Sequence, residues 1–153
     1  MKIYLAAPLF SQMERQYNRR LAEKLKALLP QCEIVLPQDF RVGSASFNDR
    51  RHLAMVFRRC IDELSGADMV LALLDGADAD SGVAFETGYA RGLGKPVLGV
   101  RTDYRQSQVK GLNLMLAAGA SDILCHFSFN EQLDDLAGLI VEHLERLAKP
   151  PPL

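Results

Sequence analysis

One glutamate, Glu86, lies in a segment of small and apolar residues, DADSGVAFETGYARGLGKPV, which spans 78–97. The segment follows an apolar run and begins a helical pattern, so Glu86 is expected in about the first turn of a helix. Free amide groups and the helix macrodipole favour an anion there. A structural glutamate near a helix start is common, yet a carboxylate in a closed pocket can stay ionised and poorly hydrated, as a nucleophile requires. Both interpretations stay open on position alone.

A second carboxylate accompanies Glu86 as a candidate. Asp62 and Glu63, in CIDELSGAD, flank the apolar stripe of Ile61 and Leu64, so one of the two carboxylates is expected to face inward. The alternative is a solvated helix residue, because aspartate is mostly exposed. Two carboxylates in one pocket suit glycosyl chemistry, in which one attacks the anomeric carbon and the other handles a proton at the leaving group.

Other chemistries have less support. The phosphate-loop motifs GxGxxG and GxxxxGK(S/T) and the nucleophile motif GxSxG are absent. The acidic loop DGADAD fails as a calcium loop, because Ala77 and Ala79 stand where ligands are needed and Asp80 where glycine is needed. Neither the histidines nor the cysteines have ligand spacing, so no metal site is expected, and a carboxylate nucleophile that does the difficult step requires no cofactor. These residues are His52, His126 and His143, and Cys32, Cys60 and Cys125, the cysteines being expected in the core.

Hydrophobic periodicity predicts the elements that position these groups. Ser11 and Glu14 have capping-box spacing at the start of a first helix that ends before Pro30. Strands are expected over 2–7, 33–36, 68–74, 97–100 and 122–126, and further helices over 51–65, 82–93, 112–118 and 129–148. The expected inner stripe of the helix at 51–65 is Leu53, Val56, Phe57, Cys60, Ile61 and Leu64, with Gly66 as its C-cap.

This alternation predicts an α/β protein, a flavodoxin-like or Rossmann-like three-layer sandwich with a five-stranded parallel sheet. One domain is expected over 1–148, followed by a loose tail over 149–153. Ligands of such sheets bind outside the carboxyl ends of the strands. The segments expected there are 6–10, 37–50, 75–86 and 102–113. Small residues such as Gly88 and Gly92 make the helix at 82–93 thin enough for its backbone to approach the sheet or a ligand.

Composition excludes several classes of partner. The chain has 153 residues, 48% of them hydrophobic and 24% charged, which is typical of a globular domain. The net charge of −1 gives no electrostatic reason to expect nucleic acid or an anionic membrane as partner. No apolar run is long enough to span a membrane, and three cysteines without paired spacing fit a reducing compartment. A cytoplasmic protein is expected.

Four segments in order, IYLAAPLF, IDELSGADMVLALLDG, DADSGVAFETGYARGLGKPV and GLNLML, carry a family resemblance. With them the sequence resembles the nucleoside 2-deoxyribosyltransferases and the related 2-deoxynucleoside 5-phosphate N-hydrolases. The resemblance implies that Glu86 is a nucleophile forming a covalent 2-deoxyribosyl-enzyme. It implies that Asp62 protonates or holds the departing base, and that Tyr4 positions the nucleophile.

The resemblance also implies how the sugar is held. Asp80 matches a residue that recognises the 5-hydroxyl, and Asn113 one that the family donates to that hydroxyl across a subunit interface, so a homo-oligomer with shared sites is expected. The remaining expected substrate contacts are Pro8, Phe10, Gly82 and Met115. The nucleotide hydrolases tend to carry serine in place of Asp80, and a carboxylate would repel a 5-phosphate. Asp80 therefore favours a free 5-hydroxyl, although Ser81 is adjacent.

The expected function is transfer of 2-deoxyribose between nucleobases by two displacements with net retention, acting on nucleosides and free bases. An N-glycoside hydrolase of 2-deoxynucleosides or their 5-monophosphates differs only in using water as the acceptor. A non-catalytic nucleotide-sensing domain and, with less support, an FMN carrier are alternatives on the same fold.

Overall fold

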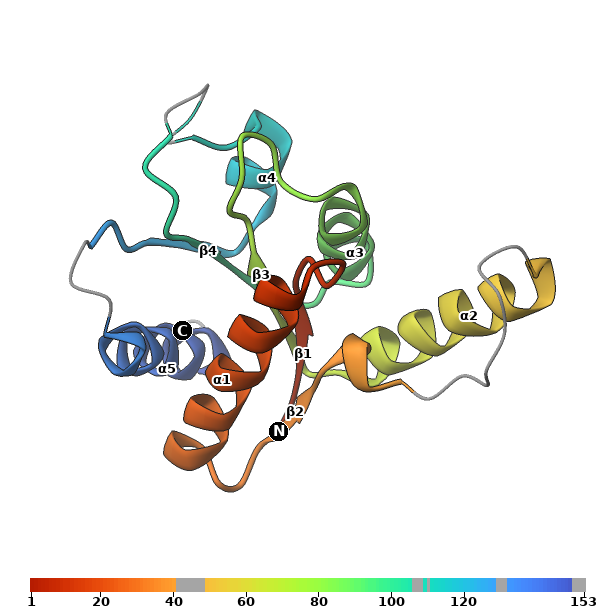
Figure 1. Ribbon diagram of the computed structural model, residues 1–153. Helices are drawn as coiled ribbons and strands as arrows, with labels where there is room; N and C mark the ends of the chain where they lie inside the picture. Colours follow the sequence, from red (N-terminus) through yellow and green to blue (C-terminus); the bar gives the residue numbers. More distant parts are fainter. Residues whose placement is uncertain (41–48, 106–108, 110, 129–131, 150–153) are drawn as a thin grey trace.

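Five parallel strands form one sheet in the computed structural model, which describes residues 1–40, 49–105, 109, 111–128 and 132–149 (Figure 1). The strands are β1 (Lys2–Ala6), β2 (Glu33–Val35), β3 (Met69–Leu73), β4 (Val97–Arg101) and β5 (Asp122–Cys125). Their order is β2-β1-β3-β4-β5, with every pairing parallel. The predicted sheet is confirmed, and the strand order reverses between β1 and β3, where α/β sheets bind ligands.

Helices cover both faces of the sheet. The helical elements are α1 (Gln12–Leu28), the short 3-10 helix η1 (Pro37–Asp39), α2 (Arg50–Gly66), α3 (Ser81–Gly92), α4 (Leu114–Gly119) and α5 (Leu133–Ala148). The helices α1 and α5 pack against each other on one face, while α2 and α3 cover the other and α4 packs against α3 (Figure 1). The predicted three-layer sandwich is therefore confirmed.

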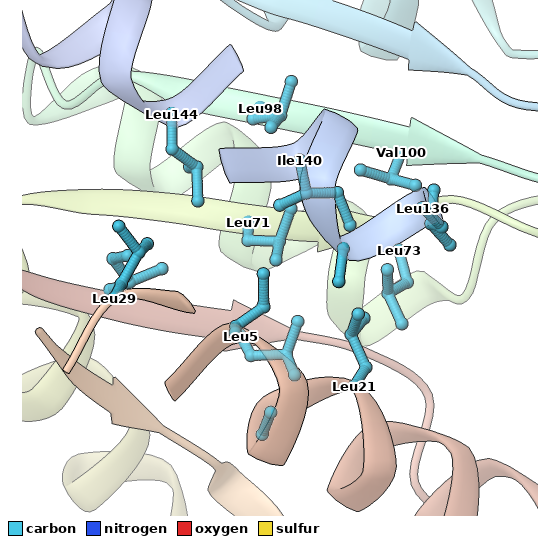
Figure 2. Close-up of a cluster of buried hydrophobic side chains, with 14 of the residues drawn as sticks. Leu5, Leu21, Leu29, Leu71, Leu73, Leu98, Val100, Leu136, Ile140 and Leu144 are labelled. Atoms are coloured by element: carbon cyan, nitrogen blue, oxygen red, sulfur yellow. The ribbon is translucent and has the colours of Figure 1, made fainter. Parts of the chain in front are cut away.

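Alternation along β1 separates the two faces, because successive side chains of a strand point to opposite sides. Ile3 and Leu5 pack with α1 and α5, whereas Tyr4 and Ala6 point towards α2 and α3. Figure 2 shows the first core, where Leu5 of β1 lies among side chains from the neighbouring strands and from both helices. The core thus fixes the register that turns Tyr4 towards α3.

The first helix begins as its sequence predicts. The Ser11 hydroxyl accepts a hydrogen bond from the Glu14 backbone amide at 3.1 Å, and the Glu14 carboxylate accepts one from the Ser11 amide at 2.6 Å. This capping box satisfies two amide groups that a helix start would otherwise leave free. Leu21 and Leu25 of the same helix are fully buried.

Part of the predicted inner stripe of α2 is wrong. Leu64 is buried, but Leu53 and Phe57 are 45% and 57% exposed. Figure 1 shows the reason: only the later turns of α2 lie over the sheet, and its first turns extend away from it. Gly66 is also the last residue of the helix and not its C-cap, which is Ala67.

The glycines of α3 do not serve a close approach to the sheet. Val83, Thr87 and Ala90 form its buried side, and a Cβ added at Gly88 or Gly92 would meet open space.

Most of the predicted 37–50 loop (41–48) and of the predicted tail (150–153) lies outside the described residues. Within the described part, no helix is long and apolar enough to cross a membrane.

Two leucines of α1 provide a matched test of the packing. Leu25→Ala is expected to lower the free energy of unfolding by about 2–5 kcal/mol, because it empties a fully buried position. Leu28→Ala, at a position 51% exposed in the same helix, is expected to cost less than about 1 kcal/mol. Urea denaturation of both variants measures the difference, and equal losses would contradict the placement of α1.

Candidate active site

The predicted nucleophile and its predicted partner meet at the point where the strand order reverses. The Tyr4 hydroxyl donates a hydrogen bond to Glu86 Oε1 at 2.5 Å, although 82 positions separate the two residues in the chain. Tyr4 is fully buried in β1, and Glu86 is half-buried on the side of α3 that faces β1. The carboxylate and the phenol are therefore brought together by tertiary structure and not by proximity in the sequence.

Burial is the main influence on Glu86. It raises the pKa of the carboxyl group, the Tyr4 hydrogen bond lowers that pKa, and the nearby charge of Asp80 raises it, with a net rise. Burial and the Glu86 charge also raise the pKa of Tyr4. Tyr4 thus keeps its proton and acts as a donor, which leaves Glu86 Oε2 available for chemistry.

Asp80 occupies the helix start that the sequence assigns to Glu86. It is the N-cap of α3, and its Oδ1 accepts from the amides of Gly82 at 2.9 Å and Val83 at 3.0 Å. Glu86 lies one turn further along, so Tyr4 and not the free helix amides stabilises its charge. Within the described residues, Asp80 Oδ2 has no hydrogen-bond partner and can accept one from a ligand.

Cys60 is the residue that sequence reasoning missed. It was expected in the core, yet it is only half-buried on α2. Burial, first, and the Glu86 carboxylate raise the pKa of the Cys60 thiol.

Asp62 does not join this cluster. It is exposed on α2, and no interaction with Tyr4 or Glu86 occurs in the described part of the chain. The neighbouring Glu63 faces a different partner, the Lys2 ammonium group, at 2.6 Å. The assignment of Asp62 to the leaving group stays a prediction.

The other predicted substrate contacts lie at the same edge of the sheet or on α4. Phe10 and Met115 are 75% and 79% exposed, and Pro8 accepts a hydrogen bond from Asn18 through its carbonyl. Asn113 is exposed and caps α4, accepting from the Met115 amide at 2.9 Å. The side chains of Phe10, Asn113 and Met115 therefore face outward in a single chain, and their roles stay predictions.

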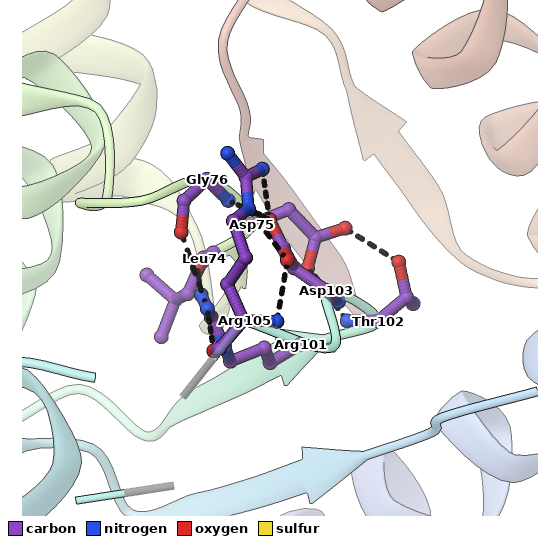
Figure 3. A network of polar contacts seen from close by, with 7 residues as sticks. All are labelled: Leu74, Asp75, Gly76, Arg101, Thr102, Asp103 and Arg105. Carbon is purple, nitrogen blue, oxygen red and sulfur yellow. Dashed lines mark hydrogen bonds and ion pairs between the residues drawn. The ribbon is translucent and has the colours of Figure 1, made fainter. Parts of the chain in front are cut away.

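A buried arginine connects the loops that follow β3 and β4 (Figure 3). Arg101, 1% exposed at the end of β4, donates to the carbonyls of Leu74 at 2.7 Å, Gly76 at 3.1 Å and Arg105 at 2.9 Å. Gly111, with a φ of 85°, packs on this guanidinium, and any Cβ there would lie 2.5 Å from Arg101 Nε.

A carboxylate completes the connection between the same two loops. Asp75, after β3, accepts from the Thr102 amide and hydroxyl at 2.6 Å each and from the Asp103 amide at 3.0 Å. In return, Asp103 accepts from the Gly76 amide at 3.0 Å. These bonds fix the loop that leads from β3 into Asp80 and α3.

A cavity of about 550 Å³ lies elsewhere, at the carboxyl ends of β4 and β5. Tyr17, Arg20, Thr102 and His126 are among its lining residues, and Tyr4 and Glu86 are not. It opens on the α1 side of the sheet, so it is separate from the Glu86 cluster. Among the residues described, no group of three histidines, cysteines or acidic residues could hold a metal ion.

Comparison with known proteins indicates the family of the chain. A sequence model of the nucleoside 2-deoxyribosyltransferases matches residues 3–146. A conserved protein of Enterococcus faecalis V583 is 27% identical, with a TM-score of 0.72 over 94% of this chain and 98% of its own. No match was found among curated proteins.

Two further solved structures share the fold. A 2-deoxyribosyltransferase of Bacillus psychrosaccharolyticus is 23% identical, with a TM-score of 0.73 over the whole of both chains. A CMP N-glycosidase of Clostridium botulinum is 15% identical, with a TM-score of 0.60 over 89% of this chain and 98% of its own.

The raised pKa of Glu86 predicts a pH-dependent effect on stability. Because the folded state binds this proton more tightly than the unfolded state, stability falls as pH rises from the ordinary glutamate pKa through the raised one. Glu86→Gln is therefore expected to unfold at higher urea concentration than the unaltered protein at neutral pH, with the gap closing in acid. Glu142→Gln, at an exposed position of α5, is the matched control. A gap that persists unchanged in acid would contradict the burial of the Glu86 charge.

Proposed function

The chain belongs to the nucleoside 2-deoxyribosyltransferase family, and on this premise we propose that it cleaves the N-glycosidic bond of a 2-deoxynucleoside and passes the sugar to a second nucleobase. The observation that carries the proposal is the 2.5 Å hydrogen bond from Tyr4 to the half-buried Glu86. A carboxylate oriented through one oxygen and poorly hydrated has the properties of a glycosyl nucleophile.

In the first step, Glu86 Oε2 attacks the anomeric carbon of the sugar. A carbon–oxygen bond forms as the carbon–nitrogen bond breaks, and the electron pair of that bond leaves with the base, which takes up a proton. The Tyr4 hydrogen bond holds the carboxylate in one orientation during the attack. Asp62, exposed on α2, is the predicted donor of that proton.

In the second step, a nitrogen of the incoming base attacks the same carbon from the opposite side. The new carbon–nitrogen bond forms as the bond to Glu86 breaks, the incoming base gives up its N–H proton, and the carboxylate recovers its electron pair. Two displacements give net retention of configuration at the anomeric carbon. The reaction needs no electron carrier, since no atom changes its oxidation state overall.

Asp80 supports recognition of the sugar. Its Oδ2 is available to accept a hydrogen bond from a 5-hydroxyl, while Oδ1 is held by the helix amides. Asn113, exposed at the start of α4, would serve the site of a neighbouring copy in the expected homo-oligomer. Nucleosides and free nucleobases are the corresponding partners.

Hydrolysis is the second candidate. In a single chain Glu86 is only half-buried and the adjacent Phe85 is 52% exposed, so water can reach the covalent sugar. Transfer exceeds hydrolysis only where the closed pocket keeps water away from the intermediate.

One experiment separates these functions. The protein is incubated with thymidine or deoxyinosine and a second free base, and the products are followed by chromatography. A new deoxynucleoside supports transfer, whereas free 2-deoxyribose alone supports hydrolysis. No turnover of nucleosides or their 5-monophosphates would overturn both and favour a nucleotide-sensing domain.

Removal of the nucleophile is expected to abolish turnover. Glu86→Gln keeps the shape of the side chain but loses the charge, so kcat should fall by at least about 1,000-fold. The exposed Glu142→Gln serves as the control with unchanged turnover. Mass spectrometry of protein trapped with a slow substrate analogue should find the sugar on Glu86 alone, and an adduct on any other residue would contradict the mechanism.

Asp80→Ser tests recognition of the 5-position. Serine also caps helices, so α3 should keep its start while the negative charge is lost. The ratio of kcat/KM for a 5-monophosphate over that for the nucleoside is expected to rise by about tenfold. Asp78→Ser, exposed in the same loop, should leave this ratio unchanged. If the unaltered protein already prefers the 5-monophosphate, the assignment of Asp80 is wrong.

A further inference from the structure

The cavity at the carboxyl ends of β4 and β5 has a large apolar and aromatic part. Met13 of α1 and Leu133 and Leu136 of α5 line it, together with the rings of Tyr17 and Tyr104. Its volume of about 550 Å³ falls within the roughly 300–1,000 Å³ of small-molecule sites. Aromatic rings stack on tyrosine side chains and are removed from water by leucine and methionine. One part of a ligand here is therefore expected to be an aromatic ring.

The rest of the lining is polar and carries positive charge. Arg20 of α1 and His126, after β5, line the cavity, and no aspartate or glutamate is among its described lining residues. The neighbouring Arg19 is paired with Asp39 at 2.5 Å, whereas Arg20 makes no hydrogen bond or ion pair within the described part of the chain. A guanidinium without a partner favours an anionic ligand, and a phosphate group matches its paired N–H donors.

Two carboxylates beside the cavity already have donors. Asp75 accepts from the amide and the hydroxyl of Thr102, a lining residue, at 2.6 Å each. Asp134, in the first turn of α5, pairs with the Lys24 ammonium group. Burial, first, and the Asp75 charge raise the pKa of Tyr17 to about 12, so its hydroxyl keeps its proton and can donate. Neither carboxylate therefore occupies the donors of Arg20.

We propose that this cavity is a second ligand site, separate from Glu86, which binds an aromatic phosphate monoester of the size of a nucleoside 5-monophosphate. Arg20 and His126 bind the phosphate, since a guanidinium donates through paired N–H groups and an imidazole through at least one. Tyr17 and Tyr104 contact the aromatic ring. This second site goes beyond the proposed function and does not depend on it.

Both halves of such a ligand are needed to match the lining. Inorganic phosphate would pair with Arg20 but leave the leucine and methionine surface in water. A neutral ring would cover that surface but leave the guanidinium without a partner. A nucleoside 5-monophosphate joins the two halves through a sugar, whose hydroxyl groups suit the polar lining side chains of Ser128 and Gln132.

Fluorescence can report on this cavity directly. The chain contains no tryptophan, so Tyr104→Trp places a single fluorophore at the cavity and keeps an aromatic ring there. This protein is titrated with AMP and with UMP, ribonucleotides that lie outside the 2-deoxy substrates of the proposed function. A saturable change is expected with at least one of them, and adenosine, uridine and inorganic phosphate should each bind at least about tenfold more weakly.

Two results of the titration would overturn the second site. One is the absence of a saturable change with either nucleotide, and the other is a nucleoside that binds as tightly as its monophosphate. Isothermal titration calorimetry checks that the protein with Tyr104 in place binds the same nucleotide. Binding to the Tyr104→Trp protein alone would also overturn the proposal.

Two adjacent arginines of α1 provide a matched pair of variants. Arg20→Gln should weaken nucleotide binding by at least about tenfold, because it removes charge-assisted hydrogen bonds to the phosphate. Arg19→Gln should leave the affinity unchanged, because Arg19 pairs with Asp39 and is not a lining residue. Both positions are exposed and glutamine is a good helix former, so both variants should fold. Equal affinities in the two variants would overturn the role of Arg20 and with it the second site.

Binding in the catalytic site would give a different pattern. A nucleotide held beside Glu86 would respond to Asp80→Ser and not to Arg20→Gln, and this outcome would overturn the second site. A nucleotide that responds to Arg20→Gln, in a protein that turns over no nucleoside, would support the second site and refute the proposed function. Turnover of nucleosides without any Arg20-dependent binding would refute the second site and leave the proposed function intact.

Discussion

A half-buried carboxylate is costly unless a donor meets it, and the Tyr4–Glu86 hydrogen bond meets that requirement. The packing of β1 and of α3 brings these two side chains together. Tyr4 is fixed by the pairing of β1 with β3 and by the alternation that sends Ile3 and Leu5 into the opposite core. Glu86 is fixed by α3, which lies over the same strands through Val83, Thr87 and Ala90.

The loops impose a second constraint on α3. Arg101 and Asp75 connect the turns that follow β3 and β4, so the path into Asp80 is set by hydrogen bonds to buried backbone groups. Asp80 then caps the N-terminus of α3. The two carboxylates therefore differ in their hydrogen-bond donors. Asp80 accepts from backbone amides, whereas Glu86 accepts from the Tyr4 phenol and has a raised pKa.

The outer surface of this layer is less complete than the core. Large apolar side chains are exposed along α2, beside Glu86 and on α4: Leu53, Met55, Phe57, Phe85, Leu114 and Met115. Phe57 and Phe85 lie 6.1 Å apart between ring centroids, and Phe85 stacks with Tyr89. Exposed apolar surface of this kind is typical of a protein–protein contact, and the homo-oligomer stays a prediction.

Sequence alone determined the alternation of strands and helices, the capping box at Ser11, the family resemblance and the choice of Glu86 and Tyr4. These depend on periodicity, local capping and motif order, which a sequence displays directly. It could not decide which flank of α2 faces the site, because Cys60 and Asp62 differ by only two positions of a helix. It also could not show that the first half of α2 lies uncovered. Those questions were decided by tertiary structure, since only the packing of α2 across β1 and α3 determines which side chains of α2 are buried and which meet water.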